Sequence, residues 1–178
     1  MRAVADKAKR ARFEHAVMPH FDAAYNLARW LTRSEGDADD VVQESYLRAF
    51  TFFDSFRGGD ARAWMLSIVR NTCFTWLRKN RVHDLMTEFD EALHGSESAN
   101  PETMTLRRAD AEAVREAVAT LPAEFREVLV LREMEGLSYK EIAEITGIAM
   151  GTVMSRLSRA RDRLHDRLCV PAREESHT

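Results

Sequence analysis

Apolar residues in the last third of the chain recur every three or four positions, in two runs separated by a glycine. The second run places its apolar positions on one helical stripe, at Val153, Leu157, Ala160, Leu164 and Leu168. Spacing of this kind buries one face of an α-helix. The first run starts with Ser138 and Glu141, which can form a capping box, and it ends at Gly147, which can adopt a left-handed turn at low cost. The pattern predicts a helix-turn-helix.

The opposite face of the second helix carries hydroxyl and guanidinium groups. They repeat with the helical period at Thr152, Ser155, Arg156, Arg159 and Arg163. Such side chains donate hydrogen bonds to base edges and phosphates, and an apolar back would hold them toward a DNA duplex. A solvated charged face is the plainer alternative. The capped helix and the glycine turn before it favour DNA recognition.

Helical periodicity also dominates the first 83 residues. The first stripe is Phe13, Val17, Phe21, Ala24, Ala28 and Leu31, and Pro19 is expected to open a second helical segment within it. After a break at residues 34–37, the second stripe is Ala38, Val41, Ser45, Ala49 and Phe52. Asp60 is expected to cap a third helix that ends near Val69. Because no segment alternates polar and apolar residues as a strand would, the sequence predicts an all-α fold.

The helix after residue 37 has a polar face that begins with acidic side chains. The face consists of Asp39, Asp40, Gln43, Glu44 and Arg48. Acidic residues in a first turn stabilise the helix dipole, which accounts for the aspartates. It does not account for the polar residues of the later turns. A docking surface for a basic partner is therefore the second interpretation, and periodicity alone leaves both open.

A basic and aromatic run follows at residues 65–83, which contain no acidic residue. Its cations are Arg70, Arg78, Lys79 and Arg81, and the aromatic residues in or beside the run are Trp64, Phe74 and Trp76. Cations contact phosphates, and planar rings stack on bases that have left a duplex. Some of these rings are expected to belong to the core instead. With Asn71 at its head, the run is typical of a surface that binds single-stranded DNA.

Residues 84–105 reverse this charge, with six acidic residues and no Lys or Arg. Gly95 and Pro101 interrupt any helix there, so we expect a flexible acidic linker. The chain is thereby divided into two small helical domains, at residues 10–83 and 106–170. In the second domain a helix begins near Leu106, and Pro122 opens another that ends before Gly136.

Composition argues against a membrane protein and against a metalloprotein. The chain has 178 residues, of which 45% are hydrophobic and 31% charged, with a net charge of −3. No long apolar run is present, so we expect a cytoplasmic protein. Cys73 and Cys169 lie far apart, and the six His residues are scattered. No pattern of metal ligands results, and we expect no metal, no cofactor and no catalytic site.

Several short motifs, in this order and spacing, carry a family resemblance over residues 12–169. In the first domain they are 39–44 (DDVVQE), Ala49-Phe50, Phe56-Arg57, 63–65 (AWM) and Arg70-Asn71 with Arg78. In the second they are Leu121-Pro122, Phe125-Arg126, 137–143 (LSYKEIA), 151–153 (GTV), 155–157 (SRL) and 159–161 (RAR). The chain resembles the extracytoplasmic-function (ECF, group 4) sigma factors of the sigma-70 family, the dissociable initiation subunits of bacterial RNA polymerase.

The resemblance implies partners and sites. The acidic helix would dock on the β′ clamp of core RNA polymerase, and the second domain would lie at the β flap. The residues that would read and melt the −10 element are Arg70, Asn71, Thr72, Trp76, Arg78, Lys79 and Arg81. The helix-turn-helix stripe would read the −35 element of promoter DNA, the linker would follow the RNA exit path, and a cognate anti-sigma factor would hold the protein inactive.

Two positions depart from the family pattern. Met154 stands where most members have Lys or Arg, and Thr75 stands where many have Asp. Met154 cannot pair with a phosphate and is expected to meet a thymine methyl group or the core.

Two other functions fit the sequence less well. A helix-turn-helix regulator that acts without polymerase would leave the basic aromatic run without a role. A metal-dependent hydrolase using Asp37, Asp39, Asp40 and Glu44 lacks a His or a second carboxylate cluster to complete its site.

Overall fold

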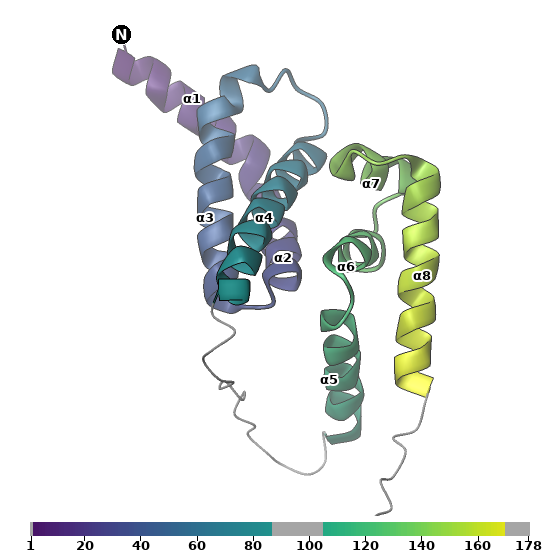
Figure 1. Cartoon of the computed structure of the whole chain (residues 1–178). Helices are drawn as coiled ribbons and strands as arrows, with labels where there is room; N and C mark the ends of the chain where they lie inside the picture. The colour runs from purple at the N-terminus through teal and green to yellow at the C-terminus, as the bar shows by residue number, and fades with distance from the viewer. Residues whose placement is uncertain (1, 87–104, 170–178) are drawn as a thin grey trace, which may run out of the picture.

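The computed structural model describes the backbone of residues 2–86 and 105–169, and the surroundings of side chains over residues 6–80 and 111–169. Every element in these ranges is helical, as predicted (Figure 1). The first domain contains α1 (Arg2–Val17), η1 (Met18–His20), α2 (Phe21–Thr32), α3 (Glu35–Phe52), η2 (Phe53–Ser55) and α4 (Ala61–Met86). The second contains α5 (Thr105–Ala119), α6 (Ala123–Leu129), η3 (Val130–Met134), α7 (Tyr139–Thr146) and α8 (Met150–Cys169).

In the first domain α2, α3 and α4 pack against one another, and α1 closes one end of this bundle. The Phe13 ring meets the rings of Phe50 and Phe53 edge to face, each with centroids 5.3 Å apart. Such pairs add to the free energy of burial. Pro19 lies in the short η1 helix that precedes α2, which confirms that it opens a new segment.

Four expectations about this domain were wrong, one of them the place of Phe21 on the apolar stripe, since this side chain is 40% exposed. The break before α3 is shorter than expected, because Ser34 accepts a hydrogen bond from the Asp37 amide and the helix starts at Glu35. Phe52 is 61% exposed, since the chain turns into η2 at this point and Phe53 enters the core instead. The third helix does not end near Val69, because no glycine or proline interrupts residues 61–86.

The division into domains is only partly visible. Helix α4 continues through residues 84–86, which the sequence assigned to the linker, and the remainder of that linker, residues 87–104, lies outside the described part of the chain.

In the second domain the predicted helix-turn-helix is confirmed. The Ser138 hydroxyl accepts a hydrogen bond from the Glu141 amide at 3.2 Å, and the Glu141 carboxylate accepts one from the Ser138 amide at 2.7 Å. Gly147 ends α7 in a left-handed conformation with φ of 70°. Helix α8 then begins at Met150.

The buried stripe of α8 is shorter than predicted. It includes Val153, Leu157 and Ala160, and Leu164 is half-buried. Leu168 is 43% exposed, because the apolar cluster on α5 and α6 reaches Leu164 and no further among the described residues.

The two domains pack against each other. Helix α4 lies against α7, and α2 lies against α6, as Figure 1 shows. Apolar residues of both domains form one buried cluster, with Met65 and Val69 on one side and Val128 and Leu131 on the other. The structure is therefore a closed arrangement of two helical domains.

We predict that Ser138→Ala lowers the free energy of unfolding by about 1 kcal/mol, because the first turn of α7 loses a capping acceptor. Urea denaturation followed by circular dichroism measures this, and Lys140→Ala, an exposed change in the same helix, is the control. Equal stability of the Ser138 variant and the control would contradict the capping role.

Candidate nucleic-acid interface

The predicted docking residues share one open face of α3. Asp39, Asp40, Gln43, Glu44 and Arg48 are all exposed. Glu44 and Arg48, four residues apart, form an ion pair on this face. Helices α2 and α4 pack against other sides of α3, and Phe13 of α1 packs against Phe50, so this face remains accessible in the closed arrangement.

The sequence prediction missed one residue of this face. Leu47 is 64% exposed and lies one turn after Gln43 and Glu44. An apolar residue inside a polar stripe was the signal that could have identified it. With Leu47 the face combines acidic groups with an apolar contact point, which is typical of a protein-binding surface.

On α4 the structure separates the predicted residues into two groups. Asn71, Arg78 and Lys79 are exposed, and Trp76 is half-buried. Thr72 is only 2% exposed and donates its hydroxyl hydrogen bond to the Ile68 carbonyl at 2.9 Å. Its side chain therefore belongs to the core of the closed arrangement. The side chain of Arg81 lies outside the described residues.

The aromatic residues of this run have different neighbours. Trp64 is half-buried and packs against the core and against Phe56, with ring centroids 4.8 Å apart, as one alternative expected. Phe74 is half-buried, and the Arg70 guanidinium lies over its ring at 4.5 Å.

Arg70, the first predicted cation of α4, is bound by the second domain. Its Nε donates to Oε1 of Glu127 on α6 at 2.7 Å, and Nη2 donates to Oε2 at 3.4 Å. The Glu127 side chain is fully buried, and that of Arg70 is 20% exposed. One of the guanidinium groups predicted to contact a DNA strand, that of Arg70, is thus bound by an internal carboxylate.

Burial raises the pKa of the Glu127 carboxyl above its ordinary value, although the hydrogen bond and the charge of Arg70 act in the opposite direction. The charge of Arg156 on α8 also acts to lower this pKa. Glu127 therefore lies in the field of arginines from both predicted DNA-reading helices. Sequence reasoning also missed this residue, because nothing in its local pattern distinguishes it from an ordinary helix residue.

A second polar contact between the domains is centred on Glu135. Its carboxylate accepts hydrogen bonds from Arg62 at 2.8 Å and from Asn26 at 2.6 Å. Arg62 also donates to the Glu135 carbonyl at 2.9 Å. These bonds join α2 and α4 to the segment that precedes α7.

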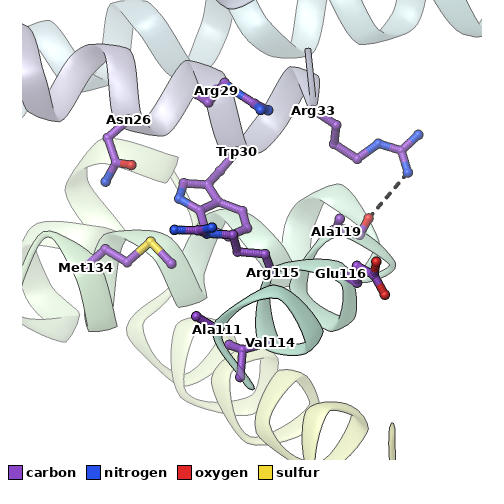
Figure 2. Close-up of a pocket in the computed structure, with 10 residues that line it drawn as sticks. All are labelled: Asn26, Arg29, Trp30, Arg33, Ala111, Val114, Arg115, Glu116, Ala119 and Met134. Carbon is purple, nitrogen blue, oxygen red and sulfur yellow. Dashed lines mark hydrogen bonds between the residues drawn. The ribbon is translucent and has the colours of Figure 1, made fainter. Parts of the chain in front are cut away.

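Near this contact, α2 and α5 border an apolar groove of about 870 Å³ (Figure 2). The Trp30 side chain projects into it, and Val114 and Met134 lie opposite. Arg33 closes one end by donating to the Ala119 carbonyl at 3.4 Å. Because both domains line the groove, it exists only while they are packed together.

The residues of the predicted stripe on α8 also differ in burial. Ser155 and Arg159 are exposed, whereas Thr152 and Arg156 are half-buried. Arg163 is exposed, and its guanidinium lies over the Phe125 ring at 4.9 Å.

One exposed face of α8 overlaps the predicted stripe only in part. It contains Met154, Ser155, Ser158 and Arg159, all exposed. Met154 is 50% exposed, so of the two contacts expected for it, a thymine methyl group or the core, the core is excluded. Compared with the predicted stripe, the outward face is rotated around the helix away from Thr152 and Arg156.

The described residues contain no group of His, Cys, Asp or Glu that could hold a metal ion. Burial raises the pKa of the Cys73 thiol to about 12, so this thiol is protonated at neutral pH. Among the described helices, none has the length and hydropathy that a membrane span requires.

Comparison with known proteins gave two family matches. Residues 16–82 match sigma-70 region 2, and residues 111–164 match sigma-70 region 4. The ECF RNA polymerase sigma factor SigE of Mycolicibacterium smegmatis is 31% identical over 99% of this chain and 69% of its own length. The ECF RNA polymerase sigma-E factor of Haemophilus influenzae is 34% identical over 80% of this chain and 79% of its own.

Two solved structures have the same fold. The sigma factor RpoE of Bartonella quintana, in complex with the anti-sigma factor NepR, has a TM-score of 0.70 and 31% identity, and the match covers 89% of this chain and 98% of RpoE. CnrH, in complex with the cytosolic domain of CnrY, has a TM-score of 0.64 and 27% identity, with 94% of each chain covered.

We predict that Arg70→Ala lowers the free energy of unfolding by about 3 kcal/mol at neutral pH, because the variant leaves a buried carboxylate without its partner. The loss should shrink as the pH falls. A group whose pKa is raised in the folded state binds more protons there than in the unfolded state, so acid stabilises the folded variant relative to its unfolded form.

Urea denaturation of the wild-type protein and the variant over a pH series measures this difference. Arg78→Ala, an exposed change on the same helix, should cost less than about 0.5 kcal/mol at every pH. A loss for Arg70→Ala that does not depend on pH would contradict the role assigned to Glu127.

Proposed function

Because this chain belongs to the extracytoplasmic-function sigma factors of the sigma-70 family and directs promoter-specific initiation by RNA polymerase, we propose which of its surfaces perform each step. The face of α3 docks on core polymerase, the exposed part of α4 binds the −10 strand, and α8 reads the −35 duplex. The observation that carries the proposal is the open α3 face, which stays accessible while Arg70 of α4 is bound by the second domain.

Docking on α3 is supported by charge and by exposure. Asp40 and Glu44 lie one turn apart and both point to solvent, with Leu47 beside them. Stabilisation of the helix dipole explains acidic groups in the first turn only. It does not explain Glu44 or an exposed leucine three turns into the helix, whereas a partner with basic and apolar side chains explains both.

The −10 step needs the domains to separate. In the closed arrangement Arg70 is bound to Glu127, while Asn71, Arg78 and Lys79 are already exposed. Polymerase that holds the two domains apart would release Arg70 and present the whole helix to a melted strand. Stacking and phosphate contacts there would offset the few kcal/mol that flipping a base costs.

The net charge of −3 is consistent with this division of labour. A protein of this charge gains little from non-specific attraction to DNA, so polymerase must supply most of the affinity. Two weak contacts with promoter DNA give tight binding when polymerase holds both domains at the correct separation. Once one domain is bound, the effective concentration of the other at its site is high.

Two alternatives account for fewer observations. A regulator that acts without polymerase gives the α3 face no role. A metal-dependent hydrolase needs a ligand cluster, and none occurs among the described residues. We also propose an anti-sigma factor as a further partner, since RpoE and CnrH were each solved in complex with another protein, in the case of RpoE an anti-sigma factor.

We predict that Asp40→Arg combined with Glu44→Arg reduces the affinity for core polymerase at least tenfold, because both charges that face the partner are reversed. Competition against a labelled sigma factor for core enzyme measures the affinity. Glu112→Arg with Glu116→Arg, an equal reversal on exposed positions of α5, is the control. Normal competition by the α3 variant would refute the docking assignment.

We predict that Arg159→Ala lowers −35-dependent initiation roughly tenfold, since one good side chain–base contact is worth about 1 to 3 kcal/mol, and leaves core binding unchanged. Multi-round transcription in vitro, with and without the −35 element, measures the effect. Arg167→Ala, an exposed arginine in the last turn of the same helix, is the control. If both variants behave alike, α8 does not read the element through Arg159.

A further inference from the structure

Helix α8 exposes two methionine side chains close to the turn of the helix-turn-helix. Met150 is 52% exposed and Met154 is 50% exposed, one helical turn apart. Val153 and Leu157, each three residues after one of these methionines, are buried, so the two methionines lie at the border between the buried stripe and the exposed side of the helix. Neighbouring apolar side chains that stay in water are typical of a surface that binds a partner.

Met154 is surrounded by hydrogen-bond donors. Ser158 lies one turn further along the helix, and Ser155 and Arg159 flank this pair on the exposed side. In a helix, residues separated by three or four positions are neighbours, so these four side chains form one continuous surface. This surface, which we call the outward face, has an apolar thioether among polar groups.

The chemistry of DNA restricts what such a side chain can contact. A thioether has no hydrogen to donate and no charge, so it gains nothing from a phosphate. In the major groove the base edges present donors, acceptors and one apolar group, the methyl group of thymine. Base contacts in this motif come from the N-terminal part of the second helix, and Met154 lies in the first turns of α8.

We propose that Met154 packs against a thymine methyl group in the −35 element and makes thymine the preferred base at that position. Arg159 supplies a polar contact from the next turn of the same face. This inference rests on the proposed reading of the −35 duplex by α8. It adds a determinant of base preference that the predicted stripe did not contain, because that stripe consisted of hydroxyl and guanidinium groups only.

The first experiment selects the preferred −35 sequence. Holoenzyme assembled from core RNA polymerase and this protein transcribes a template library with a randomised −35 block, and the transcribed templates are sequenced. For the wild-type protein we expect one position with strong enrichment of thymine. Met154→Leu should retain the enrichment because it keeps an apolar side chain, and Met154→Lys should lose it.

The second experiment removes the methyl group alone. Uracil replaces thymine at the enriched position of the selected promoter, which leaves every hydrogen-bonding group of the base in place. Initiation by the wild-type holoenzyme should fall about fourfold, the factor expected for losing the burial of one methyl-sized group. The Met154→Lys holoenzyme should initiate equally well from both templates.

Met18→Lys is the matched control, because this methionine is 48% exposed but lies in the first domain. It should respond to uracil as the wild-type protein does. The proposal is overturned if no thymine is enriched, or if uracil leaves wild-type initiation unchanged. It is also overturned if Met154→Lys lowers the affinity for core polymerase without changing the selected sequence, since Met154 would then contact protein.

Arg159→Ala separates failure of this inference from failure of the proposed function. If that variant loses −35 dependence while uracil has no effect, α8 still reads the element and only the methyl contact is refuted. If neither change affects initiation, the assignment of α8 to the −35 element fails as well.

Discussion

The ion pair between Arg70 and Glu127 joins the two halves of the molecule, and much of the rest depends on it. Glu127 has no exposed surface, and it points across the domain boundary to an arginine of α4. A buried carboxylate is costly unless it is paired, so its position is tolerable only while that arginine stays in place. The raised pKa of Glu127 indicates that pairing with Arg70 does not fully offset the cost of burial.

The same contact limits what the closed molecule can do. Arg70 cannot bind a melted DNA strand and Glu127 at once, and Thr72 is inside the core. The face of α3 is open in this arrangement, so under the proposed docking polymerase would bind before the domains separate. A ligand shifts an equilibrium only by its difference in affinity for the two states. The domains would therefore separate only if polymerase bound the open form more tightly than the closed form.

The groove between α2 and α5 follows from the same closure. It is lined from both domains and is lost when they part, so a molecule that occupied it would favour the closed form. The Arg33 hydrogen bond to α5 that closes one end of the groove joins residues that are far apart in the sequence. The state of the domain interface thus governs both the groove and the availability of Arg70, which we propose contacts the −10 strand.

Several local features could be predicted because their causes lie within a few residues. The capping box of Ser138 and Glu141 and the left-handed Gly147 depend on neighbours three or four positions away. The acidic face of α3 and the exposed cations of α4 follow from helical periodicity in the same way. Periodicity predicted burial less well at the ends of helices, where Phe52 and Leu168 are exposed. Burial there depends on how far the neighbouring helix extends.

The sequence by itself determined the helices, the turn of the helix-turn-helix and the kinds of side chain that each surface offers, since these follow from spacing and local hydrogen bonds. Only the tertiary structure decided which flank of α8 faces solvent, and hence that Met154 is exposed while Arg156 is half-buried. It alone decided that Arg70 meets Glu127, 57 residues further along the chain. Contacts between such distant positions depend on how whole helices pack, and no local pattern encodes that packing.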